Sequence, residues 1–326
     1  GILYFTTYIV FQFVLMTFFA LVLFAVIDLQ IEISIIYTLF QVLLFYQLLS
    51  NRSFIYNQRL GLLAYNGIAL MLSLINLDNG STISLIVTAI AYFVLSYFEL
   101  MKDKKSVLST ITFALGMFTT ATVIAKQFDQ DIETFLFLIQ GGFGVYVGYI
   151  LKSKWKTIIG GVFYSLGVLM TLVTPIYEIF STAFFTHLLL IVTFVFILYK
   201  TSNFVLSKTK AGYKAFFFSF MMLLFIVLTK TGGAVSDDGD FNSLTISFLW
   251  MIYASAAIWY SRLKNTMTIF NKNEIIYIGL VVLVITVGKL FFIDLVMVSM
   301  TIRAILFLII GAIGVGISRM FFVKKS

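Results

Sequence analysis

The chain has 326 residues, of which 61% are hydrophobic and 11% are charged, and its formal net charge is +8. A soluble globule of this length needs more polar side chains than this to cover its surface. The composition therefore excludes a soluble protein and places the chain in a lipid bilayer. Cysteine is absent, which excludes disulfides, thiolate nucleophiles and zinc–thiolate sites.

Apolar segments follow one another along the chain, and most have the length that a helix needs to cross hydrocarbon. The expected spans are residues 1–27, 33–50, 60–76, 82–100, 107–126, 132–151, 157–175, 182–199, 215–230, 244–260, 275–293 and 302–322. Strand-like alternation is absent and unpaired backbone is intolerable in lipid, so the sequence predicts an all-α polytopic membrane bundle of about 12 transmembrane helices. The connecting segments are too short for a soluble domain, so residues 1–326 are expected to form a single transmembrane domain.

Charged residues sort to opposite ends of these spans. One side carries 18 of the 22 basic residues and only three acidic ones, a balance of +15, whereas the other side has a balance of −7. Basic loops stay cytoplasmic during insertion, so both termini are predicted to be cytoplasmic and the protein to lie in the inner (cytoplasmic) membrane. Because topology explains the basic loops, we expect membrane lipids as partners and no nucleic acid.

The expected helices also follow a regular period. After an N-terminal hairpin in residues 1–56, residues 57–326 divide into five hairpin units of about fifty residues, each with a basic start and an acidic outer turn. Any evenly spaced polytopic protein shows such a period, which is the alternative to true tandem repetition. Repetition is favoured by Lys126, Lys230 and Lys289, since each ends the first helix of its unit just before acidic residues.

Four basic residues lie on the acidic side, against the general charge pattern: Lys126, Lys230, Lys289 and Arg303. In one interpretation, each lysine reaches the headgroups and pairs with a nearby carboxylate, which stabilises a turn and needs no ligand. In the other, the four converge on an outer pocket that binds an anionic group, such as the phosphate of a lipid or polymer, and Asp294 holds two of them in place.

The C-terminal part of the chain adds a family resemblance. Its pattern is Gly288-Lys289-Leu290-Phe291-Phe292-Ile293-Asp294-Leu295, followed by Thr301-Ile302-Arg303 and a glycine-rich last helix. Over residues 244–322 this resembles the bacterial multi-pass membrane proteins of domain-of-unknown-function family 2339. In that family a helix ends in Leu-Lys, an aromatic or aliphatic pair and Asp-Leu, and an Arg opens the last helix. Lys289, Asp294 and Arg303 match those positions, whereas Gly288 stands where leucine is more usual. The resemblance implies the fold and these site positions but no reaction, because the family has no established activity.

Motifs for nucleotide, dinucleotide, metalloprotease or serine-hydrolase chemistry are absent, so we expect no cofactor and no metal site. His187 is the single histidine and could serve a membrane acyltransferase as general base, with Glu178 orienting it. The alternative for His187 is a hydrogen-bonded interfacial side chain. Gln140 lies inside an expected span and precedes a glycine-rich stretch that allows either close helix packing or local unwinding, and close packing is favoured.

Three classes of function follow from these features. The first is transport, flipping or binding of an anionic lipid-linked or cell-envelope substrate at the outer face, which makes most use of the displaced basic residues. The second is a noncatalytic membrane scaffold or partner subunit of an envelope complex, with a membrane protein as its partner. The third is an integral-membrane transferase, which is least favoured, so an enzyme is not the leading interpretation.

Overall fold

The computed structural model describes residues 30–50, 56–75, 81–103, 106–201, 210–262 and 272–294, with positions 10, 14, 301, 304, 305, 308, 311, 312 and 314–316. Every regular element within these residues is helical, so the predicted all-α class is confirmed. The expected span over residues 1–27 and the basic residue Arg303 lie outside the described residues, apart from two positions in that span.

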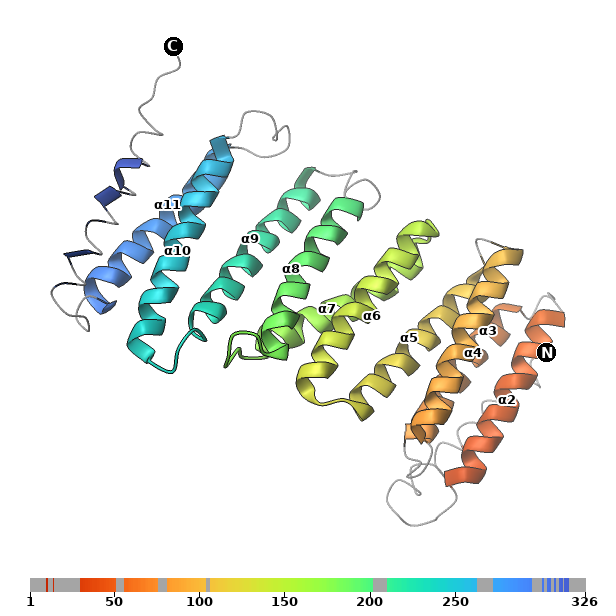
Figure 1. The fold of residues 1–326 in the computed structure, drawn as a ribbon. Coiled ribbons are helices and arrows are strands. Elements are labelled where there is room, and N and C mark those ends of the chain that lie inside the picture. Colours follow the sequence, from red (N-terminus) through yellow and green to blue (C-terminus); the bar gives the residue numbers. More distant parts are fainter. Residues whose placement is uncertain are drawn as a thin grey trace. The chain divides into compact units, whose positions relative to one another are not determined.

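Helices follow one another through the described residues, joined by short connections (Figure 1). They are α2 (Gln30–Ser50), α3 (Tyr56–Ile75), α4 (Ser81–Lys102), α5 (Val107–Gln127), α6 (Gln130–Ile150), α7 (Lys154–Val173), α8 (Thr182–Thr201), α9 (Lys210–Gly232), α10 (Gly239–Arg262), α11 (Lys272–Lys289) and a π-helical turn, η1 (Leu290–Asp294). The expected spans between residues 33 and 293 each fall on one of these helices, with α11 and η1 together forming one of them.

Among the described residues, five helical segments are long and apolar enough to cross a membrane: Thr82–Lys102, Val107–Gln127, Lys154–Val173, Gly239–Ser261 and Glu274–Asp294. Shorter apolar stretches occur in α2, α3, α8 and α9. Large apolar side chains such as Val87 and Val284 are exposed along these helices. Such surfaces are unfavourable in water and suit contact with lipid hydrocarbon, as expected of a membrane protein.

Local chemistry sets the ends of the central helices. The Ser106 hydroxyl accepts a hydrogen bond from the backbone N–H of Ser109 and so caps the start of α5. Lys126 lies in the last turn of α5, where the helix dipole favours a cation. Asp131 and Glu133 lie in the first turn of α6, where the dipole favours anions. The turn between α5 and α6 is therefore favoured in two ways: charged residues complement the dipoles of both helix ends, and the polar residues there interrupt the apolar sequence.

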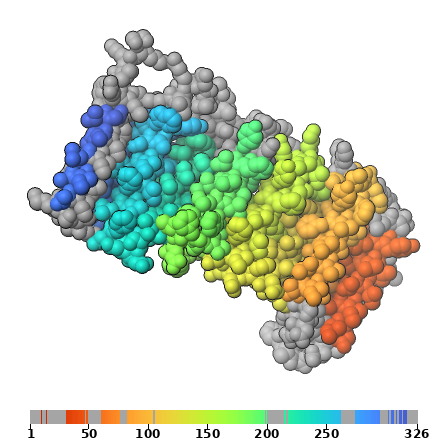
Figure 2. Space-filling model, viewed as in Figure 1, coloured from red at the N-terminus to blue at the C-terminus, as the bar shows by residue number. Residues whose placement is uncertain are grey.

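The helices group into two compact units, Gly1–Leu169 and Met170–Ser326, and the boundary falls near the end of α7. Within the first unit, α4 packs along α5 and α2 packs along α3. Within the second unit, α10 packs along α11 and also contacts α9. The space-filling view shows that side chains close the gaps between neighbouring helices inside each unit (Figure 2).

The first unit contains two buried apolar clusters. One joins α2 to α5 through Leu44, Leu63, Tyr92 and Leu115 and their neighbours. The other gathers Tyr37 and residues of α3 and α4. In the second unit, a cluster made by Phe217, Met221, Tyr253, Ala257 and Ile275 joins α9, α10 and α11.

A buried hydrogen-bond network ties α2, α3 and α4 together. Asn66 Nδ2 donates to Gln41 Oε1 at 2.6 Å and to the Tyr37 carbonyl at 3.1 Å. Gln41 Nε2 in turn donates to the Tyr92 hydroxyl at 2.9 Å. Because all four residues are buried, these bonds replace water that the interior cannot supply, and they fix how the three helices are rotated about their axes.

Small residues let α6 approach α7 closely. Gly141 lies against the backbone of Tyr164, Gly144 against Gly160, and Gly148 against the backbone of Thr157. The close packing predicted for the glycines that follow Gln140 is therefore confirmed, and α6 continues through them without unwinding.

Candidate functional site

Lys289 and Asp294 form an ion pair in the second unit, at the end of α11. Lys289 Nζ lies 2.8 Å from Asp294 Oδ1 and 3.0 Å from Oδ2. The side chain of Asp294 is fully buried, with 0% exposure, whereas that of Lys289 is 17% exposed. One charge is thus enclosed by protein and the other retains a small opening to the surroundings.

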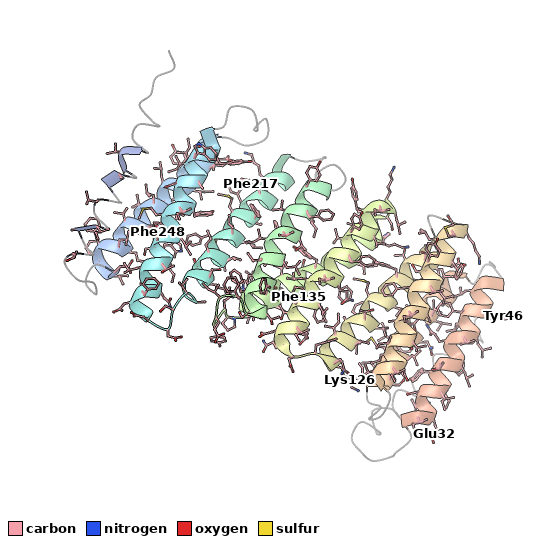
Figure 3. All side chains as sticks on the ribbon, viewed as in Figure 1. Glu32, Tyr46, Lys126, Phe135, Phe217 and Phe248 are labelled. Atoms are coloured by element: carbon pink, nitrogen blue, oxygen red, sulfur yellow. The ribbon has the colours of Figure 1, made fainter. Side chains whose placement is uncertain are left out.

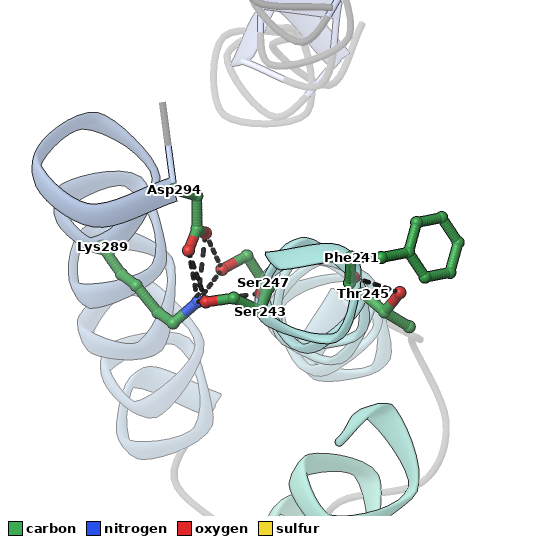
Figure 4. Close-up of polar contacts among 6 residues, drawn as sticks. All are labelled: Phe241, Ser243, Thr245, Ser247, Lys289 and Asp294. Carbon is green, nitrogen blue, oxygen red and sulfur yellow. Dashed lines mark hydrogen bonds and ion pairs between the residues drawn. The ribbon is translucent and has the colours of Figure 1, made fainter. Parts of the chain in front are cut away.

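Two serines of α10 complete this cluster (Figure 4). The Ser243 hydroxyl donates to Asp294 Oδ1 at 2.7 Å, and the Ser247 hydroxyl donates to Oδ2 at 2.5 Å. Lys289 Nζ contacts both hydroxyls, at 2.9 Å and 2.8 Å, and the Ser243 carbonyl at 2.8 Å. The four residues, Lys289, Asp294, Ser243 and Ser247, are called the Lys289 cluster below.

The π-helical turn η1 explains how Lys289 meets Asp294. Residues five apart on an α-helix point about 140° away from each other, because each residue turns the chain by about 100°. A π-helix bonds residue i to residue i+5, which brings the fifth residue back over the first. Ser243 and Ser247 are four apart and therefore share one face of α10, while Figure 4 shows Phe241 and Thr245 directed away from the cluster.

Lys289 and Asp294 lie at the end of Glu274–Asp294, and Ser243 and Ser247 lie near the start of Gly239–Ser261; both segments are able to cross a membrane. Charges in such a segment are costly unless they are paired and hydrogen-bonded, and they occur mainly at substrate sites, ion pathways and proton relays. Here the carboxylate accepts from one ammonium and two hydroxyls, so its charge is well compensated. The cluster is the best candidate for a functional site in the described residues.

Lys230 also belongs to the second unit, at the end of α9, but its surroundings differ. Its Nζ contacts the carbonyls of Leu172 at 2.6 Å, Thr174 at 2.7 Å and Thr171 at 3.4 Å. These carbonyls belong to the last turn of α7 and the residue after it, where backbone oxygens lack helical partners and the helix dipole favours a cation. Lys230 therefore caps a neighbouring helix.

His187 lies beside Lys230 and is fully buried. Its Nδ1 is 2.7 Å from the Ala183 carbonyl, so Nδ1 carries the proton in this hydrogen bond. Its Nε2 is also buried, near the backbone of Thr171, and has no hydrogen-bond partner among the described residues. Glu178, which the sequence proposed as its orienting partner, is exposed, and Ala183 holds the ring instead.

Lys126 lies in the first unit, at the end of α5. Its Nζ is 2.6 Å from the carbonyl of Ile75, the last residue of α3, and its side chain is exposed. Figure 3 shows Lys126 at the same end of this unit as Glu32, with Tyr46 at the opposite end. This placement agrees with the charge pattern, which puts both residues on the acidic side.

The three described lysines of the predicted anion site each have acceptors of their own. Lys126 and Lys230 contact ends of helices, and Lys289 contacts a carboxylate, two hydroxyls and a carbonyl. Within the second unit, no described hydrogen bond or ion pair joins Lys230 to the Lys289 cluster. Gln140, the remaining candidate, donates to the Met117 carbonyl at 2.6 Å and links α6 to α5.

Lys156 is a buried cation that the sequence treated only as part of a basic inner segment. Its Nζ contacts the Ser109 hydroxyl at 2.7 Å and lies 5.6 Å from the centre of the Phe113 ring. Ser109 also donates to the Ser96 carbonyl at 2.7 Å. The sequence held one signal: Lys156 lies in the first turn of α7 and four residues before Gly160, so the two share a face of this helix.

An apolar groove of about 370 Å³ lies between α9 and α10 in the second unit. Its lining includes Phe217, Leu224, Trp259 and Tyr260. The groove begins near the start of α9, the end opposite to Lys230. A surface of this composition on helices of a membrane protein suits contact with lipid tails.

Comparison of the whole chain with protein-family models, with curated proteins and with solved structures finds no match.

Proposed function

We propose that this chain is a bacterial inner-membrane protein with about 12 spans and cytoplasmic termini, and that it binds, flips or transports an anionic lipid-linked or cell-envelope substrate at its outer face. The observation that carries the proposal is the buried Lys289–Asp294 pair inside a segment able to cross a membrane. Ionisable residues in membrane spans are rare and mark substrate, ion or proton pathways, so this pair is taken as a functional-site hypothesis.

The geometry offers a way for an anionic group to engage Lys289. A phosphate can compete with Asp294 for the ammonium, since both present oxygens to it. Asp294 would keep two hydrogen bonds, from Ser243 and Ser247, so the carboxylate would not be left bare. In the first unit, Lys126 is exposed at the end of α5, on the predicted outer side.

Native mass spectrometry of the gently purified protein, with extraction of bound lipid, tests this proposal. The test variant carries Gln at Lys126, Lys230, Lys289 and Arg303. The matched control carries Gln at three exposed lysines of the opposite side: Lys102, Lys152 and Lys154. We expect wild type and control to retain a phosphate-bearing lipid that the test variant loses.

A single Lys126→Gln variant is the second test, chosen against a folding defect because this side chain is exposed. The proposal fails if the folded test variant and wild type retain the same lipids, or if neither retains any.

The second candidate function is a noncatalytic scaffold or partner subunit of an envelope complex. It is favoured by the fact that Lys126, Lys230 and Lys289 are all bonded to the protein itself, so each has a structural role without any ligand. This candidate predicts that the quadruple Gln variant still binds its membrane protein partner. Chemical cross-linking in intact cells, compared between wild type and the variant, distinguishes it from substrate handling.

A further inference from the structure

The Lys289 cluster offers more oxygen atoms than one ammonium can use. Five oxygens lie 2.8–3.0 Å from Lys289 Nζ: the Ser243 carbonyl, the Ser243 and Ser247 hydroxyls, and both carboxylate oxygens of Asp294. A lysine ammonium has only three hydrogens to donate. The surroundings of Nζ therefore have the form of a coordination shell around a cation rather than of a set of single hydrogen bonds.

The charge and chemistry of this shell select a class of ion. Carboxylate, hydroxyl and carbonyl oxygens are the ligands of hard cations. The shell holds one negative charge, that of Asp294, which balances one positive charge. Its distances suit an ion of ammonium or potassium size and are far longer than the roughly 2.0–2.1 Å that magnesium requires.

The serine hydroxyls and the end of α11 favour a cation at this position. The hydroxyl hydrogens of Ser243 and Ser247 point to Asp294, so their lone pairs are left for the central cation. The cluster also lies at the C-terminal end of α11, where the helix dipole favours positive charge. The side chain of Lys289 keeps 17% exposure, whereas that of Asp294 has none.

We infer that these five oxygens form a binding site for a small monovalent cation, that the Lys289 ammonium is its built-in occupant, and that a free cation takes its place when the ammonium leaves. This inference concerns an ion rather than the anionic substrate and holds whether or not that substrate is bound. The site would thus exchange the ammonium of Lys289 for a small cation from solution.

The first test uses Lys289→Ala, which empties the shell. Thermal unfolding in detergent is measured in potassium, sodium, methylammonium or choline chloride at equal ionic strength. Choline is too large for the shell and serves as the reference. We expect Tm to rise by about 3 °C for each tenfold increase of a bound cation above its dissociation constant. Equal Tm values in all four salts would overturn the inference.

Two control variants separate the shell from general salt effects. Lys289→Met fills the space with an uncharged side chain, and Lys289→Ala combined with Asp294→Asn removes the negative charge of the shell. Neither is expected to show the cation-dependent rise in Tm. A rise of equal size in the Asp294→Asn double variant would place the cation elsewhere and overturn the inference.

The second test uses the wild-type protein and so does not depend on a variant that folds. Lysine acetylation by a water-soluble reagent is followed at each site by peptide mass spectrometry. Potassium or sodium, compared with choline, is expected to speed acetylation of Lys289 and to leave that of Lys126 and Lys152 unchanged. An unchanged rate at Lys289 would refute the exchange between ammonium and free cation.

Discussion

Gly144 and Gly160 pack backbone to backbone: a β-carbon on Gly144 would lie 2.8 Å from the Cα atom of Gly160. The same β-carbon would lie 2.8 Å from Cε of Met117 on α5, so three helices meet at this glycine. No side chain larger than hydrogen fits such a contact without moving a helix. The position of α6 within the first unit therefore requires a residue without a β-carbon at position 144.

We expect Gly144→Ala to destabilise the protein by about 1–3 kcal/mol, because overpacking at a backbone contact forces the helices apart. Gly142 and Gly161 lie on the same two helices but face open space. Alanine at either position should be neutral or stabilising by about 0.5–1 kcal/mol, through its better helix propensity. Thermal unfolding in detergent measures all three variants, and equal effects at Gly142 and Gly144 would contradict the close packing of α6 against α7 at Gly144.

The buried network of Gln41, Asn66 and Tyr92 predicts a coupling between helices. Asn66→Leu removes the donor to Gln41 Oε1 and should cost about 0.6–2 kcal/mol, the range of such bonds between membrane helices. The Gln41→Leu and Asn66→Leu double variant should cost less than the sum of the two single variants. Reversible unfolding in mixed micelles gives the four free energies, and strict additivity would mean that the network carries no coupling.

Lys156 and Ser109 predict an asymmetry between two substitutions. Lys156→Met keeps the volume, removes a buried charge and should be neutral or stabilising, since few groups compensate the ammonium. Ser109→Ala removes the hydroxyl acceptor of that ammonium and should cost about 1–3 kcal/mol. Adding Lys156→Met to Ser109→Ala should recover part of this loss. The same unfolding assay checks the order, and a large loss from Lys156→Met would show that the charge itself stabilises the fold.

Lys230 and Lys126 form a matched pair of helix-end caps. Lys230 contacts three carbonyls of α7 and its following residue and is partly buried, whereas Lys126 contacts one carbonyl of α3 and is exposed. Lys230→Met should therefore cost up to about 2 kcal/mol, and Lys126→Met about 0.3–1 kcal/mol. The difference in Tm between the two variants is the readout. A larger effect at Lys126 would mean that the cap explanation is wrong for Lys230.

The helices themselves could be predicted well from the sequence. Each expected span between residues 33 and 293 falls on a helix, because a run of apolar residues between charged turns is a local property of the chain. The close packing near Gln140 was also predictable, since glycines at Gly141, Gly144 and Gly148 leave one side of the helix flat.

Partners across helices could not be predicted in this way. Lys289 and Asp294 are close in sequence, but Ser243 and Ser247 lie 46 and 42 residues before Lys289, and only helix packing brings them to its ammonium. For Lys126, the sequence pattern did not indicate the contact with the Ile75 carbonyl. Every residue has a backbone carbonyl oxygen, so a pattern of residue types cannot indicate which carbonyl a side chain will contact.

The sequence by itself therefore determined the helical class, the approximate position of each helix between residues 33 and 293, and which end of each helix gathers basic or acidic residues. These follow from local hydrophobicity and charge, which act residue by residue. The tertiary structure alone decided what each buried polar group bonds to, including Lys156 with Ser109 and Lys289 with its five oxygens. Those contacts depend on how each helix is rotated about its axis and placed beside its neighbours, a balance of packing over many side chains that no single segment contains.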